Sequence, residues 1–415
     1  MQIFRVGLLL GLRQIQRANR WTTFLIIVVM TLTFLNLVAV SGILVGLITG
    51  SERAVQEKLI GDVLISSLDD EDYILRSPLI INTLRNNPSV YGVAPRLDKG
   101  GSIEANYRSR RNFSKERDIV NARITGIEPL AEEKISRFSE NIVEGEPLLP
   151  DDTGYVLIGA ILIDRFTEDF PDIANSLSDI YPGDTVRISV GSVAKEYTVK
   201  GIVDAKVGEL TTSVFMPLHE LQRLSKKHDY NVSRISVKLH DPDKALPLQD
   251  QLYSLKFNQY GKIQTFEQAL PKFIQDIKNT FNILGAFIGA VGIIVASITI
   301  FIIIFINALS RRRQIGILKG IGIDHRAIEI AYIMQATIYV VSGSLIGAII
   351  IYGFLIGYFD NNPIDFPFSD GILVADPIST LIRFSILFVV TLAAGFIPAW
   401  LIVKQNTLNA ILGRK

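Results

Sequence analysis

The hydrophobic positions of this chain fall into four long runs, one near the start and three in the last third of its 415 residues. Each run exceeds the roughly 20 residues that an α-helix needs to cross a bilayer. The pattern therefore predicts four transmembrane helices. A signal peptide is the alternative for the first run, but its apolar part is too long for one, which favours a retained membrane anchor.

Basic residues in the flanks of the runs predict their orientation. Lys and Arg gather before the first run, between the second and third, and after the fourth, whereas the loop between the third and fourth is acidic. By the positive-inside rule, both termini and the basic loop are cytoplasmic. The predicted layout is a cytoplasmic amphipathic entry helix (1–20), helix 1 (21–48), an extracytoplasmic domain (49–280), helix 2 (281–306), a basic cytoplasmic loop (307–329), helix 3 (330–358), an extracytoplasmic loop (359–381), helix 4 (382–403) and a cytoplasmic tail (404–415).

The segment between the first two runs reads as a folded domain. Strand-like stretches at 62–67, 185–190, 196–203 and 233–239 mix with short helical patterns, and Gly- and Pro-containing turns separate them. The predicted fold class is an α-helical membrane protein with four transmembrane helices plus a large α+β extracytoplasmic domain inserted between helices 1 and 2.

Both ends of this domain continue the flanking helices in the sequence pattern. Apolar residues recur at helical spacing after the first run and before the second. We interpret them as helical stalks that join the domain to the membrane; two helices docked on their own domain are the alternative. The positions are Leu47, Val55, Leu59, Leu270, Phe273, Ile274, Ile277, Phe281 and Leu284, with Ser51 at the same spacing.

Composition excludes several classes of function. The formal charge of +1 gives no indication of nucleic-acid binding, and the absence of cysteine excludes disulfides and cysteine nucleophiles. The sequence has no P-loop, no serine-hydrolase elbow and no histidine spacing that would gather a metal. We therefore expect neither an enzyme nor a cofactor of its own.

The runs also lack Asp, Glu, Lys, Arg and His between their ends, with Arg383 close to the outer boundary. Ion-coupled transporters use ionisable groups at membrane depth, so the energy source is expected to lie outside this chain. Small residues instead recur at helical spacing, at Gly285, Gly289 and Gly292, at Gly343 and Gly347, and at Gly353 and Gly357. They suit either packing within one bundle or contact with a second copy.

The basic loop contains a short amphipathic stretch, QIGILKGIG. Ile315, Leu318 and Ile321, with Ile317 beside them, can line one side of a helix, while Arg312, Arg313 and Lys319 stay in water. This pattern indicates an interfacial helix that a soluble partner can reach. A basic loop that only fixes the topology is the alternative.

The stretch R-x-x-Q-I-G-I-L-K-G-I-G at 311–322 resembles the signature of FtsX-like ABC transporter permeases, which include MacB-type exporters and Lol-type lipoprotein-releasing permeases. Residues 11–20 resemble the family's entry helix, 49–61 its helix leaving the first span, YPGDTVRISV with EYTVKGIV its periplasmic core, and 398–412 its closing segment. The resemblance covers nearly the whole chain.

The resemblance implies that a cytoplasmic ABC ATPase dimer, which binds the ATP, docks on a coupling helix between helices 2 and 3. It also implies a second permease subunit in a homo- or heterodimer, an inner-membrane location, contact with membrane lipid, and a possible periplasmic or outer-membrane partner. The docking residues carried over are Arg312, Arg313, Gln314, Ile315, Gly316, Leu318, Lys319 and Gly322.

Two functions are compatible with the resemblance. One is a permease that couples the ATPase mechanically to the outer domain and exports or extracts a lipoprotein or another amphipathic substrate. The alternative is a non-transporting signalling subunit that activates a periplasmic partner such as a cell-wall hydrolase. Two features differ from family members, since Gln314 stands where Glu is common and the connection at 191–195 is too short for the carrier-recruiting hairpin of a Lol-type permease.

Overall fold

The computed structural model describes residues 2–16, 20–107, 117–167, 176–205, 207–226, 229–362, 364–366, 369–371 and 373–404. The chain divides into two compact units. The helical unit comprises Met1–Thr49, Asp276–Phe366 and Asp370–Lys415, and the sheet unit comprises Gly50–Gln275 with Pro367–Ser369. Apart from Lys404, the predicted cytoplasmic tail lies outside the described residues.

Four helices in the described residues are long and apolar enough to cross a membrane. They are Arg20–Ile60, Ile274–Ser310, His325–Asn361 and Pro377–Val403, and each contains one predicted span. The first of these helices consists of α2 (Arg20–Leu35), the π-helical turn η1 (Asn36–Val40), α3 (Ser41–Val55) and the π-helical turn η2 (Gln56–Ile60). The third consists of α12 (His325–Ile350), the π-helical turn η8 (Ile351–Leu355) and α13 (Ile356–Asn361). The second lies within α10 (Lys272–Ser310), and the fourth is α14 (Pro377–Val403).

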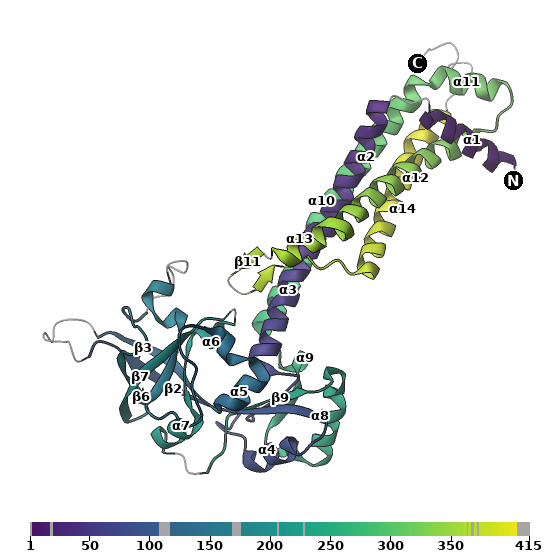
Figure 1. Cartoon of the computed structure of the whole chain (residues 1–415). Coiled ribbons are helices and arrows are strands. Elements are labelled where there is room, and N and C mark those ends of the chain that lie inside the picture. Colours follow the sequence, from purple (N-terminus) through teal and green to yellow (C-terminus); the bar gives the residue numbers. More distant parts are fainter. Residues whose placement is uncertain are drawn as a thin grey trace. The chain divides into compact units, whose positions relative to one another are not determined.

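Helix α12 packs along α2 because glycines remove the side chains between them (Figure 1). A Cβ atom on Gly343 would lie 2.4 Å from the Cβ atom of Met30, and one on Gly347 would lie 2.6 Å from the ring of Phe34. The glycines of α10 face η1 and α3 in the same way, whereas Gly353 and Gly357 have no described atom within 4 Å of such a Cβ. Internal packing therefore accounts for the glycines of α10 and for Gly343 and Gly347, and it leaves the role of Gly353 and Gly357 open.

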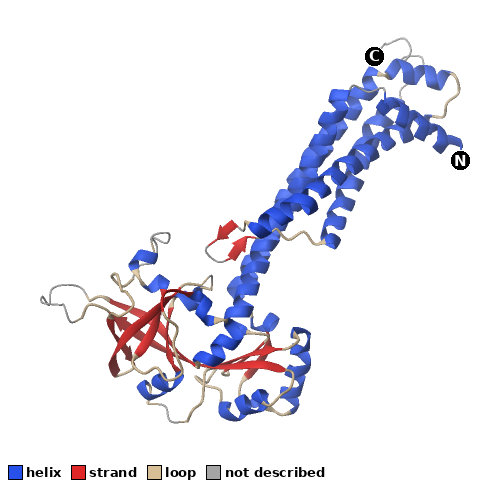
Figure 2. Ribbon diagram, in the orientation of Figure 1, coloured by secondary structure: helices blue, strands red, loops and turns tan. Residues whose placement is uncertain are grey.

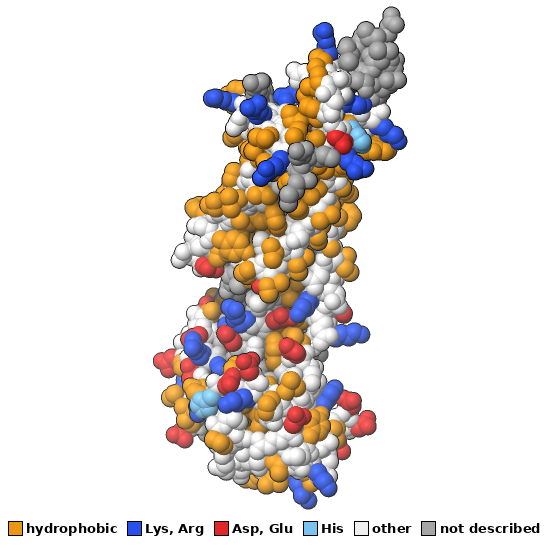
Figure 3. All heavy atoms as spheres, turned by 90° about the vertical axis from the view of Figure 1, so that its right-hand side faces the viewer, with side chains coloured by type: hydrophobic (Ala, Val, Ile, Leu, Met, Phe, Trp, Pro, Cys, Tyr) orange, Lys and Arg blue, Asp and Glu red, His pale blue; other side chains and the backbone are white. Residues whose placement is uncertain are grey.

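The N-terminal helix α1 (Gln2–Gln16) also packs on α12. Gly7 and Gly11 allow its backbone to approach Ile330 and Ala331, and Gln335 donates a hydrogen bond of 2.7 Å to Gln14. In Figure 3, hydrophobic side chains cover the visible face of the helix bundle, and Lys and Arg gather at the end that carries α1. The entry helix is thus a packed part of the bundle.

The sheet unit contains a mixed sheet of ten strands in the described residues, which confirms the predicted fold class. Strands β6 and β7 join by the two-residue turn Gly191-Ser192, in which Gly191 has φ +58°. A positive φ at the first central residue suits a type II′ hairpin turn. The strands are β1 (Val63–Ser66), β2 (Val90–Glu104), β3 (Ile119–Ile127), β4 (Ile142–Gly145), β5 (Tyr155–Gly159), β6 (Thr185–Val190), β7 (Val193–Val203), β8 (Ser213–Pro217), β9 (Arg234–Leu239) and β10 (Lys262–Thr265).

Strand β2 belongs to two parts of this sheet (Figure 2). Its first half pairs with β9, and its second half pairs with β3 on one edge and β6 on the other. Because β6 also pairs with β7, the path β2-β3-β8-β5-β7-β6 closes into a barrel filled by one apolar cluster. Pro95 lies in the half of β2 that pairs with β9, just before the pairing of β2 with β3 begins. Because the other edge of β2 has no partner strand at Pro95, its missing N–H breaks no hydrogen bond of the sheet there.

Helices cover the open part of the sheet, formed by β10, β1, β9 and β2. Residues of α4 (Ser77–Arg85) and α8 (Ala245–Ser254) share an apolar cluster with these strands. Further α-helices that the structure describes in the unit are α5 (Pro129–Ser136), α6 (Gly208–Thr211), α7 (Leu218–Leu224) and α9 (Phe266–Ala269). The 3-10 turns are η3 (Phe138–Asn141), η4 (Ala160–Leu162), η5 (Asp164–Phe166), η6 (Pro242–Lys244) and η7 (Phe257–Gln259).

The loop predicted between the third and fourth spans contains a small hairpin, β11 (Ile364–Phe366) with β12 (Ser369–Gly371). Each strand has only three residues, too few to show an alternating apolar pattern. The sequence pattern therefore did not reveal it.

Candidate functional site

The predicted coupling stretch forms a helix, α11 (Arg312–Gly320), between the second and third spans. Its C-terminal end has the hydrogen bonds of a Schellman motif, in which Ile323 N–H donates to the Leu318 carbonyl at 3.0 Å and Gly322 N–H donates to the Lys319 carbonyl at 3.1 Å. Gly322 adopts φ +90°, where a side chain would be strained. Asp324 then caps α12 by accepting from Arg326 N–H at 2.9 Å. The loop between α11 and α12 is therefore short and capped at both helix ends.

One face of α11 packs on the bundle. Ile315 is 3 % exposed and belongs to the apolar core of the helical unit, and Leu318 is partly buried against it. Gly316 is buried beside them. These three predicted docking residues therefore hold α11 on its own chain, and a partner would reach them only indirectly.

The other face of α11 is exposed, and two residues predicted for the buried apolar side lie on it. Ile321, predicted beside Ile315 and Leu318, is 71 % exposed, and Ile317 is exposed as well. A helix turns about 100° per residue, so each step of three residues falls about 60° short of a full turn. Two such steps carry position 321 from the buried face to the exposed one, where Arg313 and Gln314 also lie.

Lys319 also differs from its predicted place in water. It is half-buried, and its Nζ donates a hydrogen bond of 2.9 Å to the Val403 carbonyl in the last turn of α14. A cation at this place satisfies a carbonyl that has no partner within the helix and complements the helix dipole. Arg312, on the same side of α11, is half-buried too.

In the sheet unit, the end of the first stalk is held by a buried polar cluster that the sequence did not reveal. Arg96, on β2, forms a bidentate ion pair with Glu132 of α5, with N–O distances of 2.5 and 2.7 Å. The Arg96 side chain is 3 % exposed and that of Glu132 is 1 % exposed. Arg96 also donates to the Leu59 carbonyl at 2.7 Å, and Ser236 donates to the same carbonyl at 2.9 Å. Both bonds satisfy the Leu59 carbonyl, which lies in the last turn of η2 and lacks a helical partner.

The turn after this helix is equally fixed. Gly61 has φ +76°, and a Cβ there would lie 2.6 Å from the Val237 carbonyl oxygen. The Asp62 carboxylate accepts from Gln56 at 3.1 Å and from the Leu239 N–H at 2.8 Å. We call residues 56–62 the stalk foot.

The two stalks meet in one apolar cluster of the sheet unit. Val55, Leu59 and Ile60 belong to it, and Leu270 and Ile274 pack against it. The helices thus extend beyond the predicted spans, and their ends are docked on the domain. The two alternatives from the sequence, helical stalks and helices docked on the domain, therefore both describe these segments. The second stalk is interrupted at Pro271, which separates α9 from α10.

A second charged cluster lies farther along β2. Arg234 donates to Asp98 at 2.6 Å and forms an ion pair with Glu209 at 2.5 Å, and Thr125 donates to Asp98 at 2.8 Å. Burial by itself would raise the pKa of Asp98, but the charge of Arg234 and these hydrogen bonds outweigh it and hold that pKa below its usual value.

No group of three or more His, Asp or Glu in the described residues could hold a metal ion. His228 lies outside the described residues. In the described residues, α11 presents a mixed apolar and polar face, and the stalk foot is bonded into the sheet.

Two family descriptions match this chain. The description "FtsX-like permease C-terminal" matches residues 286–407, and "MacB-like periplasmic core domain" matches residues 23–255.

Among curated proteins, the chain is similar to the macrolide export ATP-binding/permease protein MacB of two Campylobacter jejuni strains. One is 22 % identical over 248 residues, covering 57 % of this chain and 38 % of that protein; the other is 25 % identical over 186 residues, covering 44 % and 28 %. The chain therefore spans less than two fifths of either relative.

Two solved structures are similar in part. The periplasmic region of MacB from Actinobacillus actinomycetemcomitans has 16 % identity and a TM-score of 0.36, covering 54 % of this chain and 96 % of that one. The extracellular domain of the transporter YknZ from Gram-positive bacteria has 15 % identity and a TM-score of 0.32, covering 49 % and 98 %.

Proposed function

This chain belongs to the FtsX-like ABC transporter permeases that carry a MacB-like periplasmic core domain, and from that premise we propose that it couples an ABC ATPase mechanically to the sheet unit in order to extract or export an amphipathic substrate. Four apolar helices and the family indicate an inner-membrane protein. In the proposed orientation, α11 faces the cytoplasm and the sheet unit faces the periplasm, with a second permease subunit beside this one.

The exposed face of α11 supports the ATPase contact. Ile317 and Ile321 present apolar surface flanked by Arg313 and Gln314, which suits insertion of a short helix into a groove of a soluble partner. Ile315 and Leu318 connect that face to the bundle core, so movement of α11 would reach the spans.

The stalks support the mechanical part of the proposal. Helix α10 has 39 residues without interruption, which is about 58 Å at about 1.5 Å per residue. The stalk foot carries the other helix into the sheet through buried hydrogen bonds. The bonded stalk foot is the observation that most favours force transmission.

The substrate is proposed from the family. MacB-type relatives are named for macrolide export, and Lol-type permeases release lipoproteins; both substrates are amphipathic. The two-residue turn between β6 and β7 provides no protruding hairpin in this connection, so a carrier would have to be recruited elsewhere.

The ATPase contact is tested with a double substitution, Ile317→Asp with Ile321→Asp. Placing two charges on the exposed face should weaken co-purification with the partner ATPase at least about tenfold, because apolar anchors dominate such contacts. Leu246→Asp, at an exposed leucine of the sheet unit, is the matched control and should leave the ATPase bound. Full ATPase binding by the double variant would refute the docking proposal.

Transport is separated from signalling by reconstituting the permease and its ATPase in liposomes that contain a labelled lipoprotein or a labelled macrolide. ATP-dependent loss of label from the bilayer is the expected result. If ATP changes the sheet unit without moving either label, the signalling alternative replaces transport.

A further inference from the structure

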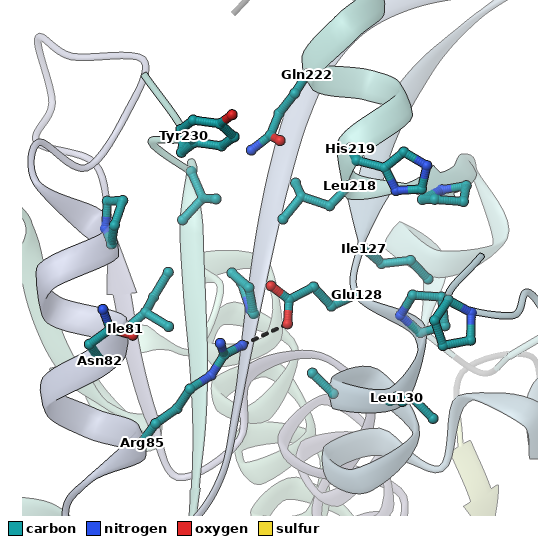
Figure 4. Close-up of a pocket in the computed structure, with 17 residues that line it drawn as sticks. Ile81, Asn82, Arg85, Ile127, Glu128, Leu130, Leu218, His219, Gln222 and Tyr230 are labelled. Atoms are coloured by element: carbon teal, nitrogen blue, oxygen red, sulfur yellow. Dashed lines mark hydrogen bonds and ion pairs between the residues drawn. The ribbon is translucent and has the colours of Figure 1, made fainter. Parts of the chain in front are cut away.

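A pocket of about 490 Å³ opens in the sheet unit where the barrel meets the open sheet (Figure 4). Pro95 of β2 lies in its wall, together with residues of α4, α5 and α7. This volume falls within the range of pockets that hold small organic molecules.

The deeper wall of the pocket is apolar. Ile81, Ile127 and Val232 line it and are themselves buried. At the rim, Leu130 is 71 % exposed and Tyr230 is 69 % exposed. Large apolar side chains left in water around a concave apolar wall mark a binding surface.

Polar groups reach the same pocket. Gln222 is only 8 % exposed, its side-chain amide makes no hydrogen bond with any residue that the structure describes, and this amide points toward Tyr230 in Figure 4. Its amide atoms are not fully enclosed, so they are open to the pocket, where water or a ligand can bind them. Asn82 and His219 also line the pocket.

The charges in the pocket cancel each other. Arg85 and Glu128 form an ion pair of 2.6 Å across the lower part of the pocket in Figure 4. A ligand with a net charge would have to break this pair to gain from either side chain. A ligand with a neutral hydrogen-bonding head leaves the pair intact and can bind the Gln222 amide.

We propose that this pocket binds a small amphipathic molecule with an apolar body and a neutral hydrogen-bonding head, and that its occupancy acts on the stalk foot. Its role as a substrate site rests on the proposed function, whereas the binding itself does not.

The route to the stalk foot consists of direct contacts. Pro129, Leu130 and Ala131 of α5 line the pocket, and the next residue, Glu132, holds Arg96. Arg96 in turn follows Pro95 of the pocket wall and donates to the Leu59 carbonyl. A displacement of the first turn of α5 by a ligand therefore reaches the stalk through one buried ion pair.

The binding test uses 4-benzoylbenzyl alcohol, a photoreactive molecule with two aromatic rings and one hydroxyl group. The full chain in lipid nanodiscs is irradiated with it, and labelled peptides are identified by mass spectrometry. Label is expected at Leu130 or Tyr230. Ala131→Phe and Leu130→Glu should each reduce this label about tenfold, because the first fills the space that the ligand would occupy and the second replaces an apolar side chain of the rim with a charge.

Leu246→Glu is the matched control for Leu130→Glu, since it changes an exposed leucine of another short helix, and it should label as the unmodified chain does. The anionic 4-benzoylbenzoate should label the pocket several-fold less than the alcohol, because its carboxylate loses hydration there and must compete with Glu128 for Arg85. Equal labelling by the two probes would overturn the neutral head. Unchanged labelling in Ala131→Phe would overturn the site itself.

The coupling test measures hydrogen exchange at the stalk foot with and without the alcohol, in the absence of any ATPase. Exchange in residues 56–62 is expected to change several-fold on binding and to remain unchanged in Ala131→Phe. Pocket labelling without a change at the stalk foot would overturn the coupling and leave the binding site. Because neither measurement uses the ATPase, both results stand whether or not the docking face of α11 is confirmed.

Discussion

Helix α11 and the stalk foot are attached to the protein in contrasting ways. Apolar contacts and the hydrogen bond from Lys319 to the Val403 carbonyl hold α11 within the described part of the chain, and the face with Arg313, Gln314 and Ile317 stays exposed. The stalk foot is enclosed, and Arg96, Ser236 and Asp62 satisfy its backbone groups from the surrounding strands. A partner can reposition the first attachment at small cost, whereas the second must move with the sheet.

The largest expected effect comes from Arg96→Met. The substitution leaves the Glu132 carboxylate buried without its partner, which should lower the stability of the sheet unit by about 3–5 kcal/mol. Hydrogen exchange of peptides from β2 at increasing denaturant concentration measures this loss.

The double variant Arg96→Met with Glu132→Leu is the control, because it removes both charges. It should recover most of the lost stability. If the single variant is as stable as the unmodified chain, the stalk foot is held by its apolar contacts alone, and the contrast with α11 disappears.

Acid should weaken the sheet unit through Asp98 while leaving the attachment of α11 unchanged. Because the folded-state pKa of Asp98 is lowered, its contribution is complete above its unfolded pKa of about 3.9 and is lost as the pH falls through the folded value. At pH 7, Asp98→Asn should cost about 1.5–3 kcal/mol, the value of hydrogen bonds to a charged group. The difference in stability between the two chains should be constant above about pH 3.9 and shrink as the pH falls further; a difference that does not shrink in acid would contradict this role.

The smallest expected effect is that of Lys319→Met. Losing the hydrogen bond to Val403 should cost about 0.5–1.5 kcal/mol and speed hydrogen exchange in α11 several-fold, while the ATPase still binds. Arg313→Met, at an exposed position of the same helix, serves as the comparison and should leave exchange unchanged. Equal exchange in the two variants would show that apolar contacts alone hold α11.

Much of the fold could be predicted from local patterns. Strands β1, β6, β7 and β9 lie where alternation predicted them. The longest strand, β2, was missed, because its residues change partners halfway along and its burial follows no single alternation. Pro95 within it also argues against a strand until the unpaired edge is known.

The candidate site was partly predictable. The signature located α11, but its true exposed face depends on how the helix rests on the bundle, which moved Ile321 outward and Lys319 inward. Arg96 and Glu132 are 36 residues apart and belong to no motif. Only the fold brings them together.

The sequence by itself determined the four membrane spans and the position of α11, because hydrophobic length and helical spacing are properties of neighbouring residues. Closure of the barrel, the bonded stalk foot and the pocket beside Pro95 were decided by tertiary structure. Each requires residues far apart in the chain to meet in space, and a single sequence records no such pairing.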